Sequence, residues 1–441
     1  MLALGSDLLG VNAMLKAVFA RVDVTPPLGT YISGYFNDRY AKGILDPIQL
    51  NALALSDGST TNLIVISDFL GMNRTFCGII RDKIADRTGI DPAHVMLSAL
   101  HQHTSVIIGP RNKKESHDYV YMETVYRKYC DVAQMALDDM SDATLGFGME
   151  EVAEPIAFIR RYLMSDGTVL GHPGNRQSEI LRRIGDGDNR VRLLRFMREG
   201  KADIAFVNFC THPDVIGGEY FSADWPGFVR RYVEKDIEGV SCLLLNGVQG
   251  DSNHLDYIGG TRHGYEHSAR MGRIIADVVV KLWENTAPQA DVKLGCETDE
   301  VVLPTRTDGF ERYAECKALL EATYEGRIPR PSGAVIGEAD RIVSLRTAPA
   351  FQHLPMMVMA IGRICIVGFG GEPFTQYARS LEAARPDLTV LTSCCCNGYE
   401  EYLPTKEIFA EGGYEANCSP YPSNLEDVCV GAALELIGRI Y

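Results

Sequence analysis

Short apolar runs alternate with longer stretches of helical periodicity along this sequence of 441 residues, and this alternation narrows the choice of fold. The runs are continuous and rich in β-branched residues, as is typical of strands that are buried on both faces. They lie at Asn62–Ser67, Val95–Leu100, Ile204–Phe209, Cys242–Leu245 and Ile364–Phe369. Apolar residues recur at helical spacing in Glu123–Met140, Glu266–Glu284, Phe310–Tyr324 and Leu425–Ile440. Together these patterns predict an α/β fold with a sheet that is at least partly parallel.

The sequence shows no clear boundary between domains. A length of 441 residues would by itself suggest about three domains. However, we find no internal repeat, low-complexity tract or linker-like stretch. The segment Glu325–Gly337 is the best candidate for a softer junction, and a surface loop explains it equally well. We therefore expect one large domain.

Charge and cysteine usage exclude some classes of function. The chain carries 43 Lys and Arg against 58 Asp and Glu, a net charge of −15 at pH 7, which disfavours binding to nucleic acids and anionic membrane surfaces. Its twelve cysteines show no CxxC pairing, as expected for a reducing compartment. The first residues lack the pattern of a signal peptide, and no apolar run reaches the ~18 residues that span a bilayer. We expect a cytoplasmic protein without a transmembrane segment.

Polar or glycine-rich segments follow the predicted strands at five places. Functional residues of α/β proteins gather in loops beyond the carboxyl ends of strands, so these segments are candidates for a shared site. They are Leu97–Gly109, Asn208–Asp214, Gly247–Asp256, Gly368–Phe374 and Asn397–Asn417.

The residues in these segments suit a catalytic zinc ion. Histidines, a carboxylate and hydroxyl groups are zinc ligands, and a position left open activates a water molecule. The ligands are not spaced as a local motif, and each has a structural reading. His101 and His103 could be ordinary loop histidines, Glu372 could belong to a turn or helix cap, and the tyrosines of Asn397–Asn417 could be packing groups.

A series of motifs, in a fixed order along nearly the whole chain, resembles the neutral/alkaline non-lysosomal ceramidases. The series contains ARVDVTPPLG (Ala20–Gly29), SGY (Ser33–Tyr35), LSALHQHTS, FIRRYLMSDGTV (Phe158–Val169), NFCTHPDVIGG, SADWPG (Ser222–Gly227), Gly250-Asp251, GEPF and NGYEEYLPT with GGYE. No single motif is decisive, but their shared order is specific.

The resemblance implies a zinc-dependent amidase that cleaves linear amides. Its catalytic domain would span residues 17–441, after an N-terminal extension of residues 1–16. The implied fold is a mixed β-sheet flanked by helices, similar to the core of leucine aminopeptidase-type domains. Carried over by motif, the zinc ligands are His101, His212, Glu372 and Tyr402.

The same resemblance implies groups that face the substrate. His103 and Arg160 look like residues beside the metal or the substrate, and Tyr414 resembles a hydroxyl donor near the substrate carbonyl. Because histidine has an ordinary pKa near 6.5, His103 could transfer a proton to the leaving amine. Arg160 and Tyr414 could hold the developing oxyanion.

This sequence departs from the ceramidase pattern at the position of the family's serine. The ceramidases carry a serine in a GDVSP-like stretch, where Asn253 stands here, with Ser252 one place earlier and His254 at the position of the proline. We therefore expect attack by metal-activated water, with Ser252 and Asn253 as the residues to test as replacements. The ceramidases also have a C-terminal β-sandwich domain, for which we find no counterpart in this sequence.

Three functions remain as alternatives. The first is a zinc hydrolase of a ceramide-like or other N-acyl substrate, or an esterase, with a role in lipid metabolism. The second is a non-catalytic metal- or ligand-binding protein, which the departure at the serine motivates. The third is a structural role with relic motifs. The sequence leaves the substrate, the native metal and the oligomeric state open.

Overall fold

A nine-stranded mixed sheet forms the centre of the computed structural model, which describes residues 15–109, 119–289 and 292–441. The strand order is β16-β14-β13-β8-β1-β3-β4-β6, with β18 paired to β8. The pairs β14/β16 and β4/β6 are parallel, and the other neighbours are antiparallel. The strands are β1 (Lys16–Asp23), β3 (Gln49–Ser56), β4 (Thr61–Ser67), β6 (Val95–Ala99), β8 (Ser141–Glu151), β13 (Arg190–Arg198), β14 (Asp203–Phe209), β16 (Val240–Asn246) and β18 (Pro288–Gln289).

A second, four-stranded sheet meets the first where their strands end. It consists of β19 (Leu294–Pro304), β20 (Phe351–Ile361), β21 (Ile364–Phe369) and β23 (Thr389–Ser393), in that order, with β21 and β23 parallel. The amide of Cys394, just after β23, donates a hydrogen bond of 3.1 Å to the backbone carbonyl of Asn246 at the end of β16. A bridge between Ser98 and Cys396 joins β6 to the same segment. Loops that follow distant strands therefore meet at one end of the molecule.

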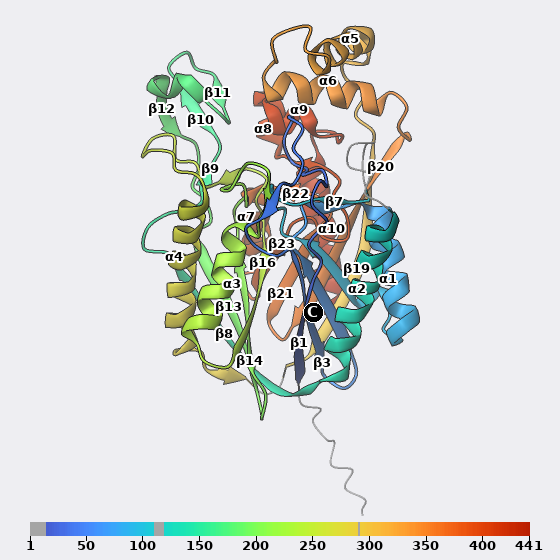
Figure 1. Ribbon diagram of the computed structural model, residues 1–441, viewed down its shortest axis with the longest axis vertical. Helices are drawn as coiled ribbons and strands as arrows, with labels where there is room; N and C mark the ends of the chain where they lie inside the picture. Colours follow the sequence, from blue (N-terminus) through green and yellow to red (C-terminus); the bar gives the residue numbers. More distant parts are fainter. Residues whose placement is uncertain (1–14, 110–118, 290–291) are drawn as a thin grey trace, which may run out of the picture.

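Helices cover the outer faces of both sheets (Figure 1). Helices α1 (Arg74–Thr88) and α2 (Tyr119–Asp138) pack on each other, and α2 contacts β1 and β3. Helices α3 (Asp224–Asp236) and α4 (Tyr265–Trp283) form the layer over β13 and β16. Helices α7 (Thr375–Ala384) and α10 (Leu425–Ile440) cover the second sheet. The apolar stripe of α4 is buried as its periodicity predicts, with Met271, Ile275 and Val279 fully enclosed.

Two small substructures project from the end of the molecule at which the strands β14, β16 and β23 finish (Figure 1). One is the sheet of β10 (Tyr162–Met164), β11 (Val169–Leu170) and β12 (Ile180–Arg183). The other is the helix pair α5 (Tyr313–Tyr324) and α6 (Gly333–Leu345), inserted between β19 and β20 and closed over its own apolar cluster. Helix α6 packs on α9 (Tyr414–Cys418).

Several short strand pairs shape the loops beyond the main sheets. These pairs are β2 (Gly43–Ile44) with β15 (Tyr220–Phe221), β5 (Gly71–Met72) with β7 (Ile107–Ile108), β9 (Phe158–Ile159) with β17 (Ser252–Asn253), and β22 (Glu372–Pro373) with β24 (Tyr402–Leu403). A further short helix, α8 (Lys406–Glu411), precedes α9.

The structure confirms the expected fold class, a mixed sheet flanked by helices. The boundary at residue 17 stays a prediction, because residues 1–14 lie outside the described part of the chain. For Glu325–Gly337 the sequence left open a junction between domains or a surface loop. In the structure this segment is the connection between α5 and α6 together with the start of α6. No helix within the described ranges is both long and apolar enough to cross a membrane.

Candidate metal centre

His101 and His212 lie just beyond the ends of β6 and β14, and backbone carbonyls fix both rings. The Nδ1 atom of His101 is 2.8 Å from the carbonyl oxygen of Leu70. The Nδ1 atom of His212 is 2.8 Å from the carbonyl oxygen of Gln249. A carbonyl oxygen only accepts, so Nδ1 of each ring carries a proton and Nε2 is the nitrogen that can bind a metal. Each of the two histidines is 1% exposed.

His101 also has an unusual backbone conformation. Its φ angle is +71°, in the left-handed region that a side chain other than glycine rarely occupies. Cys395, Asn397 and Glu401 share this feature in the segment that leads to β24. Such conformations cluster at functional sites because the surrounding structure must hold them in place.

The carboxylate of Glu372 lies between the two histidines. Its Oε2 atom is 3.4 Å from Nε2 of His101 and 3.0 Å from Nε2 of His212. Two ligands that are each ~2.0–2.1 Å from a tetrahedral ion lie about 3.3–3.4 Å apart, so these separations suit a common cation. Gly250 allows this packing, because a Cβ atom there would lie 2.3 Å from the carbonyl oxygen of Glu372.

Several polar atoms around Glu372 are buried without hydrogen bonds. Among the described residues, neither carboxylate oxygen of Glu372 nor Nε2 of His212 has a hydrogen-bond partner, and both ring nitrogens of His103 are in the same state. Buried polar atoms are nearly always satisfied by a partner, water or an ion. The residues present therefore fit a divalent cation, and their nitrogen and oxygen atoms are of the kind that zinc prefers.

The electrostatics of the centre favour a charged carboxylate. Burial alone would raise the pKa of Glu372, but His101 and His212 outweigh it and lower that pKa to about 2. Burial lowers the pKa of His101, whereas the charge of Glu372 raises it to about 9 overall. For His212, burial and the charge of Arg160 lower the pKa. A negative charge therefore stands ready at the point where the two Nε2 atoms converge.

Tyr402 is brought to the same place by strand pairing. Strands β22 and β24 run parallel with Glu372 opposite Tyr402, so their side chains emerge as neighbours. The Tyr402 ring stacks on the ring of His212, with 6.4 Å between the two ring centroids. Burial raises the pKa of Tyr402, Glu372 raises it further, and Arg160 opposes both.

His103 lies on the open side of this group. Its ring centroid is 5.0 Å from that of His101 and 5.8 Å from that of His212. One nitrogen from each of the three histidines lies within 4.8 Å of the others. Burial, with the charges of His101 and His212, lowers the pKa of His103 well below 6.5. His103 is near enough to be a ligand itself, so its separate role as a proton carrier stays a prediction.

Arg160 and Tyr414 lie beside Tyr402. The guanidinium carbon of Arg160 is 5.8 Å from the centroid of the Tyr402 ring, and Nη2 is 3.1 Å from a carboxylate oxygen of Glu415. The Nε atom of Arg160 is buried and has no hydrogen-bond partner in the described part of the chain. The Tyr414 ring is 5.6 Å from that of Tyr402. Their predicted roles toward substrate are untested.

Ser252 and Asn253 are buried next to His212 and serve the local backbone. The Ser252 carbonyl accepts from the amide of His212 at 3.1 Å, and its Oγ atom is 3.4 Å from the hydroxyl of Thr211. The Oδ1 atom of Asn253 accepts from the amide of Leu255 at 2.9 Å, which closes a turn. No histidine contact to the Ser252 hydroxyl is recorded within the described residues.

Sequence reasoning missed three groups that complete the site. Asp214 stands two residues after His212, and the hydroxyl of Tyr35 donates to it. Asn246 binds the backbone of two ligand loops. Asp214 and Tyr35 belong to two motifs of the ceramidase-like series, NFCTHPDVIGG and SGY, and this membership is the sequence feature that could have identified them. Nothing in the sequence marks Asn246 beyond its place at the end of an apolar run.

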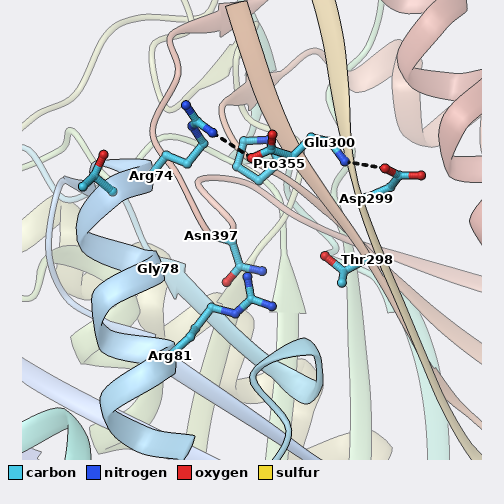
Figure 2. Close-up of a pocket in the computed structure, with 9 residues that line it drawn as sticks. Arg74, Gly78, Arg81, Thr298, Asp299, Glu300, Pro355 and Asn397 are labelled. Atoms are coloured by element: carbon cyan, nitrogen blue, oxygen red, sulfur yellow. Dashed lines mark hydrogen bonds and ion pairs between the residues drawn. The ribbon is translucent and has the colours of Figure 1, made fainter.

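A separate cavity of about 570 Å³ lies between α1 and β19 (Figure 2). Arg74 pairs with Glu300 at 2.8 Å, and Arg81 donates to the carbonyl of Pro92 at 2.6 and 2.8 Å, so both arginines on its wall have partners. Asn397 lines the cavity, five residues before Tyr402, but none of the proposed metal ligands does. The cavity is therefore not the candidate centre.

Comparison with solved structures gives this fold a precedent. Neutral ceramidase from Pseudomonas aeruginosa superposes with a TM-score of 0.76 at 14% identity, over 97% of this chain and 74% of that chain. A structure described as ceramidase complexed with C2 gives a TM-score of 0.74 at 13% identity, over 97% and 75%. No protein-family model and no curated protein sequence matches the chain. The chain therefore has the fold of about three quarters of the neutral ceramidase chain, in agreement with the order of its motifs.

Proposed function

We propose that this protein is a zinc-dependent amidohydrolase that cleaves a linear N-acyl amide. One observation carries the proposal: two imidazole nitrogens and a fully buried carboxylate converge at 3.0 and 3.4 Å with polar atoms left unpartnered. His101, His212 and Glu372 would hold the ion, with Tyr402 as the fourth ligand. The likeness to neutral ceramidase supports an amide as substrate, because that is the bond a ceramidase cleaves.

A divalent ion held by these residues supplies a Lewis acid and lowers the pKa of a water molecule to about 7. The protein's own groups would do the rest. Arg160 and Tyr414 would donate hydrogen bonds to the oxygen on which negative charge develops. The buried Nε–H of Arg160 has no hydrogen-bond partner among the described residues, which supports a donor role.

His103 would carry the proton to the leaving amine. Its ring nitrogens have no partner in the described chain, and its pKa is held well below 6.5, so it starts neutral and can accept a proton. A positioned histidine that moves a proton in this way contributes about 10²–10⁴-fold to a rate.

The nucleophile would be water rather than a serine. Ser252 is 1% exposed, and its hydroxyl contacts the hydroxyl of Thr211 at 3.4 Å, which is not a base. A serine nucleophile needs an activating base within about 2.6–3.2 Å.

The test is turnover by one preparation in two metal states. The protein is stripped with a chelator and then reloaded with zinc, and both forms are assayed on a short-chain N-acylsphingosine, a simple N-alkylacetamide and the matching acetate ester. We expect amide cleavage by the reloaded protein only. Amide cleavage that survives complete removal of metal would contradict the proposal. Cleavage of the ester alone would make the protein an esterase.

A further inference from the structure

Asp214 brings a carboxylate to the open side of the candidate metal centre. Its Oδ1 atom accepts a hydrogen bond from the hydroxyl of Tyr35 and is 3.7 Å from Nδ1 of His103, beyond hydrogen-bond range. The side chain is 29% exposed, whereas those of His212 and Glu372 are 2% and 0% exposed. Of the carboxylates of Asp214 and Glu372, that of Asp214 is therefore the one that a substrate can reach.

This carboxylate has no cationic partner among the described residues. His103 is the one basic side chain recorded within 4.0 Å of it, and the 3.7 Å separation between their nearest atoms is too long for a hydrogen bond. Arg160 pairs with Glu415 instead. A partly buried charge without a counter-ion is costly, and such groups in a site commonly meet a charge that the ligand brings.

Arg39, which packs on the ring of Tyr35, makes its hydrogen bonds elsewhere. Its Nη2 atom donates to the carbonyls of Ser33 at 2.6 Å and His103 at 2.8 Å. Its guanidinium carbon is 3.9 Å from the centroid of the Tyr35 ring. Arg39 thus holds Tyr35 and the backbone of His103 in place, and Tyr35 in turn orients the Asp214 carboxylate.

The position of Asp214 relative to His103 indicates which part of a substrate it would meet. His103 neighbours His101 and His212 through its ring and Asp214 through its Nδ1 atom. In the proposed function His103 transfers a proton to the leaving amine. Asp214 would consequently meet the amine portion of the amide.

We propose that Asp214 is a specificity-determining residue that binds a protonated amino group on the amine portion of the substrate, so that N-acyl diamines are preferred. An ammonium group replaces the missing counter-ion and can donate a charge-assisted hydrogen bond, whereas a hydroxyl group supplies only the bond. This inference rests on the proposed function, since it assumes that an amide is bound at the centre.

The test compares three amides that differ in one group. N-(2-aminoethyl)acetamide carries an ammonium, N-(2-hydroxyethyl)acetamide a hydroxyl and N-propylacetamide a methyl group. For the zinc-loaded protein we expect kcat/KM to be higher for the ammonium compound than for the methyl compound by at least about tenfold, or ~1.4 kcal/mol. Asp214→Asn should reduce that ratio to near one. Asp139→Asn, which removes a surface charge paired with Lys201, should leave the ratio unchanged.

Binding gives a second readout that does not depend on turnover. The affinities of the ammonium and methyl amides for metal-free protein are measured by NMR titration, for the unchanged chain, Asp214→Asn and Asp139→Asn. Preference for the ammonium amide that Asp214→Asn abolishes supports the inference even if no amide is cleaved, a result that would count against the proposed function alone. Equal binding of the two amides, tighter binding of the methyl amide, or a preference that survives Asp214→Asn would overturn it.

Discussion

At the scale of single residues, the candidate centre is a set of buried polar atoms that the described protein leaves without partners. Both oxygens of Glu372, Nε2 of His212 and the two ring nitrogens of His103 belong to it. An unsatisfied buried group costs about 1–3 kcal/mol, and more when it is charged. A cation at the centre would remove much of this cost, which explains why these groups lie together in a well-packed interior.

His103→Ala separates a proton carrier from a ligand. If His103 moves a proton without binding the metal, the variant keeps its zinc and loses turnover by a factor of about 10² or more. Metal content and kcat are measured on the same preparation. Loss of zinc equal to that of His101→Ala would make His103 a ligand, which the 4.8 Å grouping of the three histidines also permits.

Ser252→Ala tests the choice of nucleophile. The Ser252 hydroxyl has only the Thr211 hydroxyl near it in the described structure, so its removal should change turnover by less than about tenfold, or ~1.4 kcal/mol in the barrier. Steady-state and pre-steady-state kinetics are recorded together. Near-complete loss of activity with metal retained, and a burst phase in the unchanged protein, would establish a serine acyl-enzyme instead.

His254 should make the protein sensitive to mild acid. It is 4% exposed, and burial, together with His263 and His267, lowers its pKa to about 3. An unfolded histidine has a pKa near 6.5, so between about pH 6.5 and 3 the unfolded chain takes a proton that the folded chain does not. Stability is therefore highest above pH 6.5 and falls as the pH drops through this window.

The linkage gives a magnitude for that effect. Between pH 7 and 5 this one group should cost about 2 kcal/mol of unfolding free energy. Urea unfolding at the two pH values should show a correspondingly smaller difference for His254→Gln than for the unchanged chain. His353→Gln, at a half-exposed site, is the control and should keep the original difference. Equal pH dependence in all three proteins would show that His254 does not titrate as described.

At the scale of secondary-structure elements, Asn246 ties several strand ends together. Its Nδ2 atom donates to the carbonyls of Leu100, after β6, and Thr211, after β14, at 3.1 Å each. The backbone carbonyl of Asn246 accepts a hydrogen bond from the amide of Cys394, which follows β23. The loops of His101 and His212 are thus held in register by one buried side chain at the end of β16.

Asn246→Ala should loosen both ligand loops at once. It leaves two buried carbonyls without this donor, so we expect a loss of at least about 2 kcal/mol in unfolding free energy. Because supporting residues orient metal ligands, zinc affinity should fall about 10–100-fold. Asn62→Ala is the matched control, since Asn62 is equally buried and binds the carbonyl of Gly295 away from the centre. If zinc affinity falls equally in both variants, Asn246 has no special part in the site.

Much of this arrangement follows from sequence, and the rest depends on long-range contacts. Apolar runs located β4, β6, β14, β16 and β21 within a residue or two, because buried strands need continuous apolar residues. Polar segments after them marked the loops of His101, His212 and Glu372 as candidates for a shared site, and the ceramidase-like motifs singled out these three residues. The links through Asn246 and the missing counter-ion of Asp214 depend on residues far apart in the chain, and no local pattern encodes them.

At the scale of the whole molecule, the centre lies where two sheets meet and two small substructures project (Figure 1). The motif order predicted one α/β unit, and the superposition on neutral ceramidase over 97% of the chain confirms that fold. The helix pair α5–α6 was expected only in part, since Phe310–Tyr324 has helical spacing but the packing of α6 on α9 is a tertiary contact.

Zinc content is the measurement that tests the metal centre most directly. The unchanged chain, His212→Ala and His353→Ala are reloaded with zinc after chelation, dialysed side by side and analysed by elemental mass spectrometry. His353 is a half-exposed histidine paired with Glu300, so it controls for the loss of any imidazole. We predict one zinc ion per chain for the unchanged protein and for His353→Ala, and little for His212→Ala. Equal zinc in all three proteins, or none in the unchanged chain, would contradict the account.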